Sequence, residues 1–325
     1  MQSNVREMVM KLVTTLVLPL VAFLFCSTTA SAEQADKKAV LVTGATSGIG
    51  RNIAESLARN GFFVYAGARK KQDMDELNAL ENIAAVRLDV TVQEDVDSAV
   101  MQIQAAGRGL YGVVNNAGVL AAGPLTEMDV DQVRWQFEVN VFGVHRVTNA
   151  FRPLLVKSAG RIVNIGSIAG NIGIKYLGAY SMTKHAMEAY TDSLASEMAL
   201  LGVGVSIVQP GDFSSNIWNE AIAQGETGGL VQQSSPFKTD ISQWIARVAA
   251  MKTKQPDAVS VAVRHALSAE VPRRRYLVVP DAAEAEWVIG SAVTRLAEMN
   301  TDQDHAFTAS QLADMLEASM NELAD

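Results

Sequence analysis

The sequence predicts an α/β fold with a doubly wound parallel sheet of about seven strands. Short apolar runs rich in valine and isoleucine alternate along the chain with amphipathic stretches, which is the pattern of parallel strands covered by helices on both faces. A glycine-rich segment at 44–50 directly follows the first of these runs, as expected where a strand passes into a helix at a phosphate-binding turn. Because crossovers between parallel strands are right-handed, the pattern indicates a single Rossmann-like domain.

Each apolar run is interpreted as a strand and each amphipathic stretch as a helix. The predicted strands are 39–44, 62–68, 84–90, 112–118, 161–167, 205–211 and 276–280. The predicted helices are 51–60, 73–80, 93–106, 127–157, 179–201 and 256–269. The alternation stops at about 213–255, so we interpret this segment as a lid inserted over the substrate site.

The chain from 301 to 325 is predicted to be an acidic C-terminal helix or tail. Its apolar residues recur at helical spacing: Phe307, Leu312, Met315, Leu316 and Leu323. We expect such a helix to pack against the domain or another subunit.

The N-terminal residues 1–32 have the composition of a secretory signal peptide or a membrane anchor. Arg6 and Lys11 flank an apolar run from Leu12 to Phe25, and small residues follow up to Ala32. The run is short for a membrane span, which needs about 20 residues, but an uncleaved anchor stays open. We therefore expect export or membrane anchoring through this segment, with a cytoplasmic location as the alternative.

The charge balance argues against a nucleic-acid partner. The 325 residues carry a formal net charge of −8, which disfavours binding to a polyanion. The basic run Arg273-Arg274-Arg275 precedes a strand-like segment and is interpreted as a solvated loop. The four histidines are scattered, so no metal site is predicted, and His185 is interpreted as a packing residue.

One pair of residues has a spacing that indicates acid–base chemistry. Tyr180 and Lys184 stand four residues apart in a predicted helix, so their side chains share one face. An ammonium beside a phenol favours the phenolate and lowers the phenol's pKa. A tyrosine tuned in this way can exchange a proton with a substrate.

The glycine-rich segment indicates a nucleotide site. It reads Thr43-Gly44-Ala45-Thr46-Ser47-Gly48-Ile49-Gly50 between a predicted strand and a predicted helix. Glycines at this junction let a pyrophosphate approach the backbone and rest on the helix N-terminus.

Together these motifs resemble those of the short-chain dehydrogenase/reductase family. The matching residues stand in the usual order and at the usual spacings: the loop 43–50, Asn115-Asn116-Ala117-Gly118, Asn140, Ser167, Tyr180, Lys184 and Pro210-Gly211. The likeness extends over about 38–280 and is nearest to the branch that includes hydroxysteroid and retinol dehydrogenases. It places the family domain at 38–300.

The resemblance implies a catalytic tetrad. Tyr180 would be the general acid/base on the alcohol or carbonyl oxygen, and Lys184 would lower its pKa and hold the nicotinamide ribose. Ser167 would hydrogen-bond the substrate oxygen. Asn140 would hold a water that links Lys184 to solvent.

The resemblance also implies a set of cofactor contacts. These would come from Gly44, Ser47, Gly48, Ile49, Gly50, Arg69, Asp89, Asn116, Ala117, Gly118, Tyr180, Lys184, Pro210, Gly211 and Ser215. Asp89 would meet the adenine and Asn116 the adenosine ribose, while Pro210-Gly211 would flank the nicotinamide. Ser215 stands where the family usually has threonine and retains the hydroxyl.

The end of the second predicted strand favours NADP over NAD. An acidic residue there would bind the ribose 2′-hydroxyl of NAD, whereas an arginine accommodates the 2′-phosphate of NADP. The chain has Ala68 at this position, followed by Arg69-Lys70-Lys71, and Arg51 opens the neighbouring helix. A bidentate arginine–phosphate contact is strong, but the basic turn can also simply be solvated.

The predicted function is NADP(H)-dependent hydride transfer between the nicotinamide and a secondary alcohol or ketone, without a metal. Residues expected to contact the substrate are Ser167, Tyr176, Tyr180 and Trp218. The apolar lid suits a lipophilic substrate, although a lid also needs apolar residues merely to pack. A non-catalytic nucleotide sensor and an envelope scaffold remain alternatives. The resemblance further implies a homodimer or homotetramer assembled through the helices near 127–157 and 179–201.

Overall fold

The computed structural model describes residues 37–218 and 234–323. Its centre is a seven-stranded sheet in the order β3-β2-β1-β4-β5-β6-β7, and every neighbouring pair is parallel. The strands are β1 (Ala39–Val42), β2 (Phe63–Ala68), β3 (Ile83–Arg87), β4 (Gly112–Asn115), β5 (Arg161–Ile165), β6 (Gly204–Pro210) and β7 (Arg275–Val278). The predicted doubly wound fold is confirmed, and the order reverses between β1 and β4.

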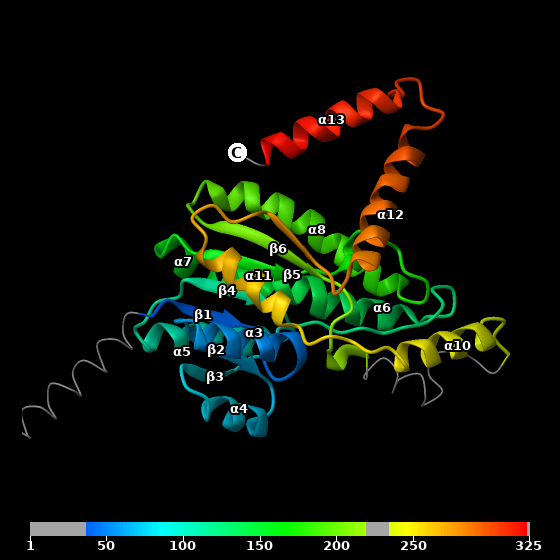
Figure 1. Ribbon diagram of the computed structural model, residues 1–325. Helices are drawn as coiled ribbons and strands as arrows, with labels where there is room; N and C mark the ends of the chain where they lie inside the picture. The colour runs from blue at the N-terminus through cyan, green and yellow to red at the C-terminus, as the bar shows by residue number, and fades with distance from the viewer. Residues whose placement is uncertain (1–36, 219–233, 324–325) are drawn as a thin grey trace, which may run out of the picture.

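Helices connect and cover these strands (Figure 1). They are α3 (Gly48–Arg59), α4 (Lys71–Asn78), α5 (Gln93–Ala105), α6 (Val130–Phe137), α7 (Val144–Lys157), α8 (Gly178–Ala199), α10 (Lys238–Ala249), α11 (Asp257–Ser268), α12 (Ala282–Asn300) and α13 (Ala309–Glu322). The predicted helix 127–157 consists of α6 and α7 joined by a π-helical turn, Glu138–Gly143. Helices α10 and α12 were not predicted.

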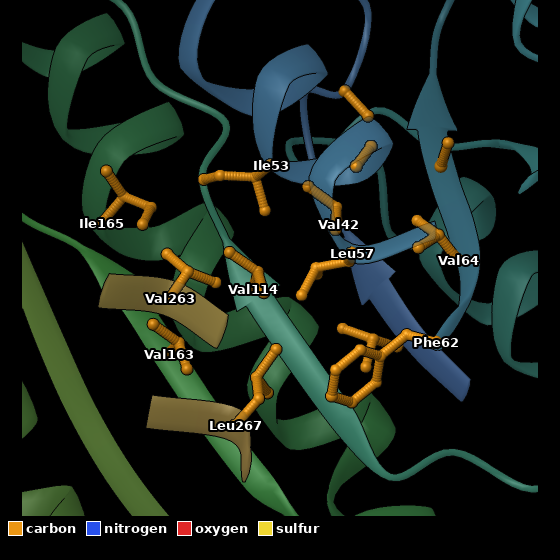
Figure 2. Close-up of a cluster of buried hydrophobic side chains, with 14 of the residues drawn as sticks. Val42, Ile53, Leu57, Phe62, Val64, Val114, Val163, Ile165, Val263 and Leu267 are labelled. Carbon is orange, nitrogen blue, oxygen red and sulfur yellow. The ribbon is translucent and has the colours of Figure 1, made fainter. Parts of the chain in front are cut away.

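Both faces of the sheet are buried, because alternate residues of each strand enter separate apolar clusters. On β1, Val40 and Val42 pack with α3 and α11, whereas Leu41 packs on the side of α5 and α7. Figure 2 shows the first cluster, in which Leu57 and Val263 meet the strands. Full burial of a leucine of this kind contributes about 1.5–3 kcal/mol. This double burial explains the continuous apolar runs seen in the sequence.

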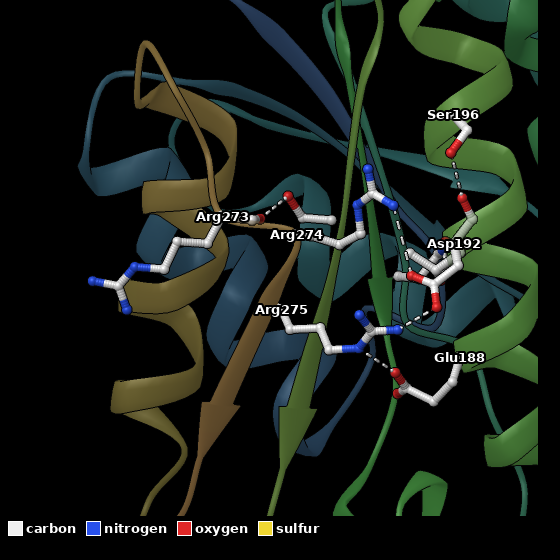
Figure 3. A network of polar contacts seen from close by, with 9 residues as sticks. Glu188, Asp192, Ser196, Arg273, Arg274 and Arg275 are labelled. Carbon is white, nitrogen blue, oxygen red and sulfur yellow. Dashed lines mark hydrogen bonds and ion pairs between the residues drawn. The ribbon is translucent and has the colours of Figure 1, made fainter. Parts of the chain in front are cut away.

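The basic run at 273–275 is not the solvated loop that we predicted. The Arg275 guanidinium lies 3.0 Å from Glu188 Oε2 and 2.6 Å from Asp192 Oδ2, both on α8. Arg274 lies 3.8 Å from Asp192 Oδ1, and Arg273 points away from these carboxylates (Figure 3). Two of the three positive charges therefore tie the start of β7 to α8.

The C-terminal helices extend beyond the body of the domain (Figure 1). Helix α12 buries only Val288, and α13 buries no residue within the described chain. The predicted helical character of the tail is confirmed, but contacts of α13 with the domain are not found. No helix in 37–218 or 234–323 is long and apolar enough to span a membrane. The predicted signal or anchor, 1–32, lies outside the described residues.

Candidate active site

A cavity of about 1030 Å³ opens at the carboxyl ends of the strands. It extends from the ends of β2 and β3, past the glycine loop, to the segment after β6 and to α10. Ligands of doubly wound sheets bind at this edge, where the strand order reverses. The fold thus brings the separate sequence motifs to one site.

Three of the four predicted catalytic residues meet in this cavity. Ser167 follows β5, while Tyr180 and Lys184 lie in the first turns of α8. The Ser167 hydroxyl lies close enough to the Tyr180 phenol to lower the pKa of that phenol. The Lys184 ammonium donates to the Ile165 carbonyl at 2.9 Å and stands 5.5 Å from the centroid of the Tyr180 ring.

The protonation of the phenol differs from our expectation. Burial raises the pKa of Tyr180 to about 12; the neighbouring Ser167 hydroxyl opposes this shift, and the charge of Asp212 adds to it. Burial also lowers the pKa of Lys184 to about 8, against the effect of Glu188. The predicted lowering of the tyrosine pKa by Lys184 is therefore absent here, because removal from water outweighs the effect of a cation bound to a carbonyl.

Asn140 lies behind these residues, within the π-helical turn, and does not border the cavity. Its amide donates to the Val119 carbonyl at 2.9 Å and to the Thr183 hydroxyl at 3.1 Å. Its carbonyl oxygen accepts from the Val119 backbone N–H at 2.8 Å. The side chain thus holds the loop after β4 against α8, and both of its donors are used within the protein.

The glycine loop approaches the loop after β4 so closely that side chains would not fit. A Cβ on Gly44 would meet the Ala117 Cα at 2.9 Å, and a Cβ on Gly50 would overlap the Gly44 carbonyl. Ser47 precedes α3 without a side-chain capping bond, so backbone N–H groups at the helix start are free to face the cavity. This cradle fits a pyrophosphate group.

Thr43 joins the two loops and was not predicted to have a role. Its buried hydroxyl accepts from the backbone N–H groups of Asn116 at 2.9 Å and Ala117 at 3.0 Å. The Asn116 amide donates to the carbonyls of Thr43 and Gly44 at 2.9 and 3.1 Å. Asn116 therefore braces the glycine loop as well as bordering the cavity.

Most of the predicted cofactor residues border the cavity: Gly44, Ser47, Ile49, Gly50, Arg69, Asp89, Asn116, Ala117, Gly118, Tyr180, Lys184, Pro210, Gly211 and Ser215. Gly48 is the exception. Its backbone has φ of 54°, and a Cβ there would lie 3.1 Å from the Ser215 hydroxyl. Gly48 thus supplies the turn into α3, in a left-handed conformation that glycine adopts without cost.

The end of β2 carries the arrangement on which the cofactor prediction depended. Strand β2 ends at Ala68, and Arg69 and Lys70 border the cavity next to it. The Arg69 guanidinium is 3.8 Å from Asp89 Oδ2. Arg51 is paired with Glu55 at 2.5 Å and is not among the residues that border this cavity.

The described part of the lid is held by a residue that we had placed in the substrate pocket. The Tyr176 hydroxyl hydrogen-bonds to Asp240 of α10, and Lys175 pairs with the same carboxylate at 2.5 Å. The Tyr176 ring packs edge-on against Trp244 with centroids 5.9 Å apart. Tyr176 is not among the residues that border the cavity; its hydroxyl and ring contact α10 and so anchor the described part of the lid.

Tryptophans from distant segments line the cavity. All four tryptophans of the chain border it: Trp135, Trp218, Trp244 and Trp287. Only Trp218 was predicted to contact substrate. Trp244 lies in the predicted lid and Trp287 lies beyond the family motifs, and no sequence signal marked either as a cavity residue. Asp212, next to Pro210-Gly211, also borders the cavity and was missed.

Within the described residues, no group of three or more histidine, cysteine, aspartate or glutamate side chains is arranged to hold a metal ion. His185, on the same helix as Lys184, contacts the Ser181 carbonyl at 2.9 Å.

Comparison with known proteins identifies the family. A family model described as short chain dehydrogenase matches residues 38–226, which is more than half of the chain.

The chain belongs to the short-chain dehydrogenase/reductase family.

Relatives across this family have similar sequences. A 3-amino-tetrahydro-pyrrolizinone reductase from Xenorhabdus hominickii is 34% identical over 76% of this chain and 88% of its own. An NADPH-dependent 3-dehydrocapnine reductase from Ornithobacterium rhinotracheale is 34% identical over 74% of this chain and 87% of its own. Mouse retinol dehydrogenase 16 is 32% identical over 74% and 80%. The chain is accordingly an oxidoreductase of the kind that acts on alcohol and ketone groups.

Solved structures support the same fold. A short-chain dehydrogenase from Streptomyces avermitilis has a TM-score of 0.68 and 27% identity, covering 88% of this chain and 99% of its own. Two Burkholderia structures match in fold alone. One, from B. cenocepacia with NADP, has a TM-score of 0.63, 24% identity and coverage of 81% and 96%. The other, from B. phymatum with NAD, has a TM-score of 0.69, 23% identity and coverage of 85% and 98%. These likenesses support the doubly wound fold.

Proposed function

We propose that this protein reduces a lipophilic ketone to a secondary alcohol with NADPH, the reverse reaction using the same residues. The observation that carries the proposal is the meeting of Ser167, Tyr180 and Lys184 in one cavity with the glycine loop. The bound nicotinamide would supply the hydride. The residues of the chain would position the carbonyl and deliver a proton to its oxygen.

Tyr180 would be the proton donor in the reduction. With a pKa of about 12, the phenol is protonated at neutral pH and ready to donate. Ser167, which borders the same cavity, would hydrogen-bond the substrate oxygen beside the phenol. Lys184 would hold the cofactor ribose and return a proton to the phenol, which suits an amine whose pKa is about 8. Since both donors of the Asn140 side chain are used, a relay water at this residue would bind its backbone carbonyl.

Preference for NADPH is supported by the end of β2. Ala68 provides no carboxylate for a ribose 2′-hydroxyl, while Arg69 and Lys70 provide positive charge for a 2′-phosphate. The relative from Ornithobacterium is NADPH-dependent by name. The 3.8 Å contact between Arg69 and Asp89 leaves the guanidinium exposed and able to turn to a phosphate.

A lipophilic substrate is supported by the wall of the cavity. Ile174, Leu177, Trp218, Trp244, Val248 and Met251 border its lid end. Apolar and aromatic linings of this kind bind drug-sized organic molecules.

The test is NADPH oxidation with a panel of ketones, comparing wild type with Tyr180→Phe. Loss of the general acid is expected to lower kcat by about 10²–10⁴-fold, with NADPH binding retained by fluorescence titration. Tyr111→Phe is the matched control, because that hydroxyl donates to the Leu267 carbonyl before β4, at the amino end of the sheet. No turnover of any ketone by wild type, with NADPH binding intact, would favour a nucleotide sensor or scaffold.

Assembly and location are separate proposals. We propose a homo-oligomer through the outer faces of α7 and α8 and the turn before α7, where Phe142, Val156 and Met182 are exposed. Light scattering of Phe142→Glu should then give a smaller species than wild type.

We also propose that residues 1–32 export or anchor the chain, which N-terminal sequencing of the mature protein and protease access would test.

A further inference from the structure

Asp212 occupies a fixed place where the cavity meets the end of β6. It follows Pro210-Gly211 at the end of β6, and its backbone N–H donates to Glu284 Oε1 at 2.9 Å. A Cβ on Gly211 would overlap the same Glu284 carboxylate, so the first turn of α12 packs directly on this segment. The side chain of Asp212 is partly buried and borders the cavity.

Its carboxylate has no cationic partner among the residues that the structure describes. No ion pair there involves Asp212, and burial alone raises its pKa. The cationic side chains that border the cavity lie elsewhere. Arg69 and Lys70 adjoin β2, and Lys184 donates to the Ile165 carbonyl. The carboxylate is nevertheless near enough to Tyr180 to raise the pKa of the phenol. An unpaired carboxylate in an enclosed site is costly unless a ligand supplies the opposite charge.

Aromatic rings border the same cavity. Trp218 and Trp244 pack edge-to-face with centroids 6.3 Å apart. Trp287 stands three residues after Glu284 on α12 and therefore shares its helix face. Indole faces attract ammonium groups, most strongly where water is excluded.

We propose that the substrate is a ketone or alcohol carrying an ammonium group, which Asp212 and the tryptophan wall hold beside the reacting carbonyl. This inference rests on the proposed function and specifies the substrate class of the same site. The apolar lining receives the body of the molecule, and the carboxylate selects its charge. A neutral carboxylic acid that only donates a hydrogen bond would explain the position of Asp212 equally, so the test separates charge from hydrogen bonding.

The experiment compares two ketones that differ only in charge. One carries a trimethylammonium group and the other the neutral, isosteric tert-butyl group, each joined to a methyl ketone by the same chain of two to five methylenes. A trimethylammonium group cannot accept a hydrogen bond, so a preference for it reports charge. Wild type is expected to show a kcat/KM ratio of at least about 10 in favour of the cation, in line with a desolvated cation–π contact plus a carboxylate.

Asp212→Asn keeps the side-chain volume and hydrogen bonding but removes the charge. Its ratio of cationic to neutral kcat/KM is expected to fall to about 1, mainly through KM. Asp97→Asn, at an exposed position on α5 outside the cavity, is the matched control and should keep the wild-type ratio. A wild-type ratio near 1, or a ratio unchanged in Asp212→Asn, would overturn the inference.

A binding measurement keeps this inference distinct from the proposed function. The cationic ketone should quench the fluorescence of the cavity tryptophans in wild type at concentrations at least tenfold lower than in Asp212→Asn. Quenching without NADPH oxidation would support the inference and contradict the proposed function. Turnover of the neutral ketone with no preferential quenching by the cation would contradict the inference alone.

Discussion

Replacing Lys184 with methionine measures what burial of this ammonium costs the fold. The side chain is 6% exposed, and burial lowers its pKa from 10.5 to about 8. Each pKa unit corresponds to about 1.4 kcal/mol, so the protonated folded state is destabilised by about 3 kcal/mol relative to the neutral one. The folded state is free of this penalty above the unfolded pKa of Lys184, where the side chain is neutral in both states. The penalty grows as the pH falls and is complete below the folded pKa.

The sign gives a clear expectation for the cofactor-free protein. Between about pH 8 and pH 10.5 the unfolded state binds more protons than the folded state, so wild-type stability rises with pH. From about pH 7 to about pH 9.5, wild type should gain about 2 kcal/mol in the free energy of unfolding relative to Lys184→Met. Because this is a change in a difference, a constant loss of the hydrogen bond to Ile165 does not affect it.

The assay is urea unfolding followed by tryptophan fluorescence, for both proteins at both pH values. Lys157→Met, on an exposed position of α7, controls for the loss of one lysine. A wild-type minus Lys184→Met difference that stays constant, or moves in favour of the variant as the pH rises, would refute the claim that burial controls this ammonium.

Three further predictions concern the loop, the cofactor and the lid. In Gly50→Ala the new methyl group would overlap a backbone carbonyl of its own loop, so NADPH binding should weaken at least about 100-fold and stability should fall by about 1–3 kcal/mol. Gly290→Ala, in open space on α12, should reduce neither NADPH binding nor stability. Equal effects of the two variants would contradict the close packing at Gly50. Arg69→Glu should lower kcat/KM for NADPH about tenfold or more, while kcat/KM for NADH stays the same or rises. Steady-state kinetics with both cofactors measures this. An equal fall of kcat/KM for NADPH and NADH would exclude recognition of the 2′-phosphate by Arg69. Tyr176→Phe removes the hydrogen bond to Asp240, which contributes about 1.5–3 kcal/mol when the acceptor is charged. The variant should raise KM for bulky ketones about tenfold and change the affinity for NADPH little. An unchanged KM would mean that this contact does not hold the lid.

Much of the fold could be predicted because its signals are local. Each of the seven strands was placed within three residues of its observed ends, since a strand buried on both faces is a continuous apolar run. Helix α12 was missed, although its N-cap Asp281 accepts from the Glu284 N–H. Its low burial leaves no strong apolar stripe, so periodicity had little to detect.

The candidate site divides in the same way. The spacing of Tyr180 and Lys184 placed both on one face of α8, and the glycine loop was found from its position between a strand and a helix. Spacing along the chain could not predict in which direction a side chain points. Tyr176 points to Asp240, 64 residues further on, and the Asn140 side chain is satisfied by Val119 and Thr183 together. Both arrangements depend on partners that only packing brings near.

The sequence by itself determined the parallel sheet, the glycine turn and the residues that meet at the carboxyl ends of its strands. These follow from periodicity and spacing, which act over a few residues. Only the tertiary structure decided the electrostatics of the site. Burial raised the pKa of Tyr180 against the expected direction and lowered that of Lys184, and the packing of α12 brought Glu284 against Asp212. Desolvation depends on everything that surrounds a group, and no local pattern in the chain encodes those surroundings.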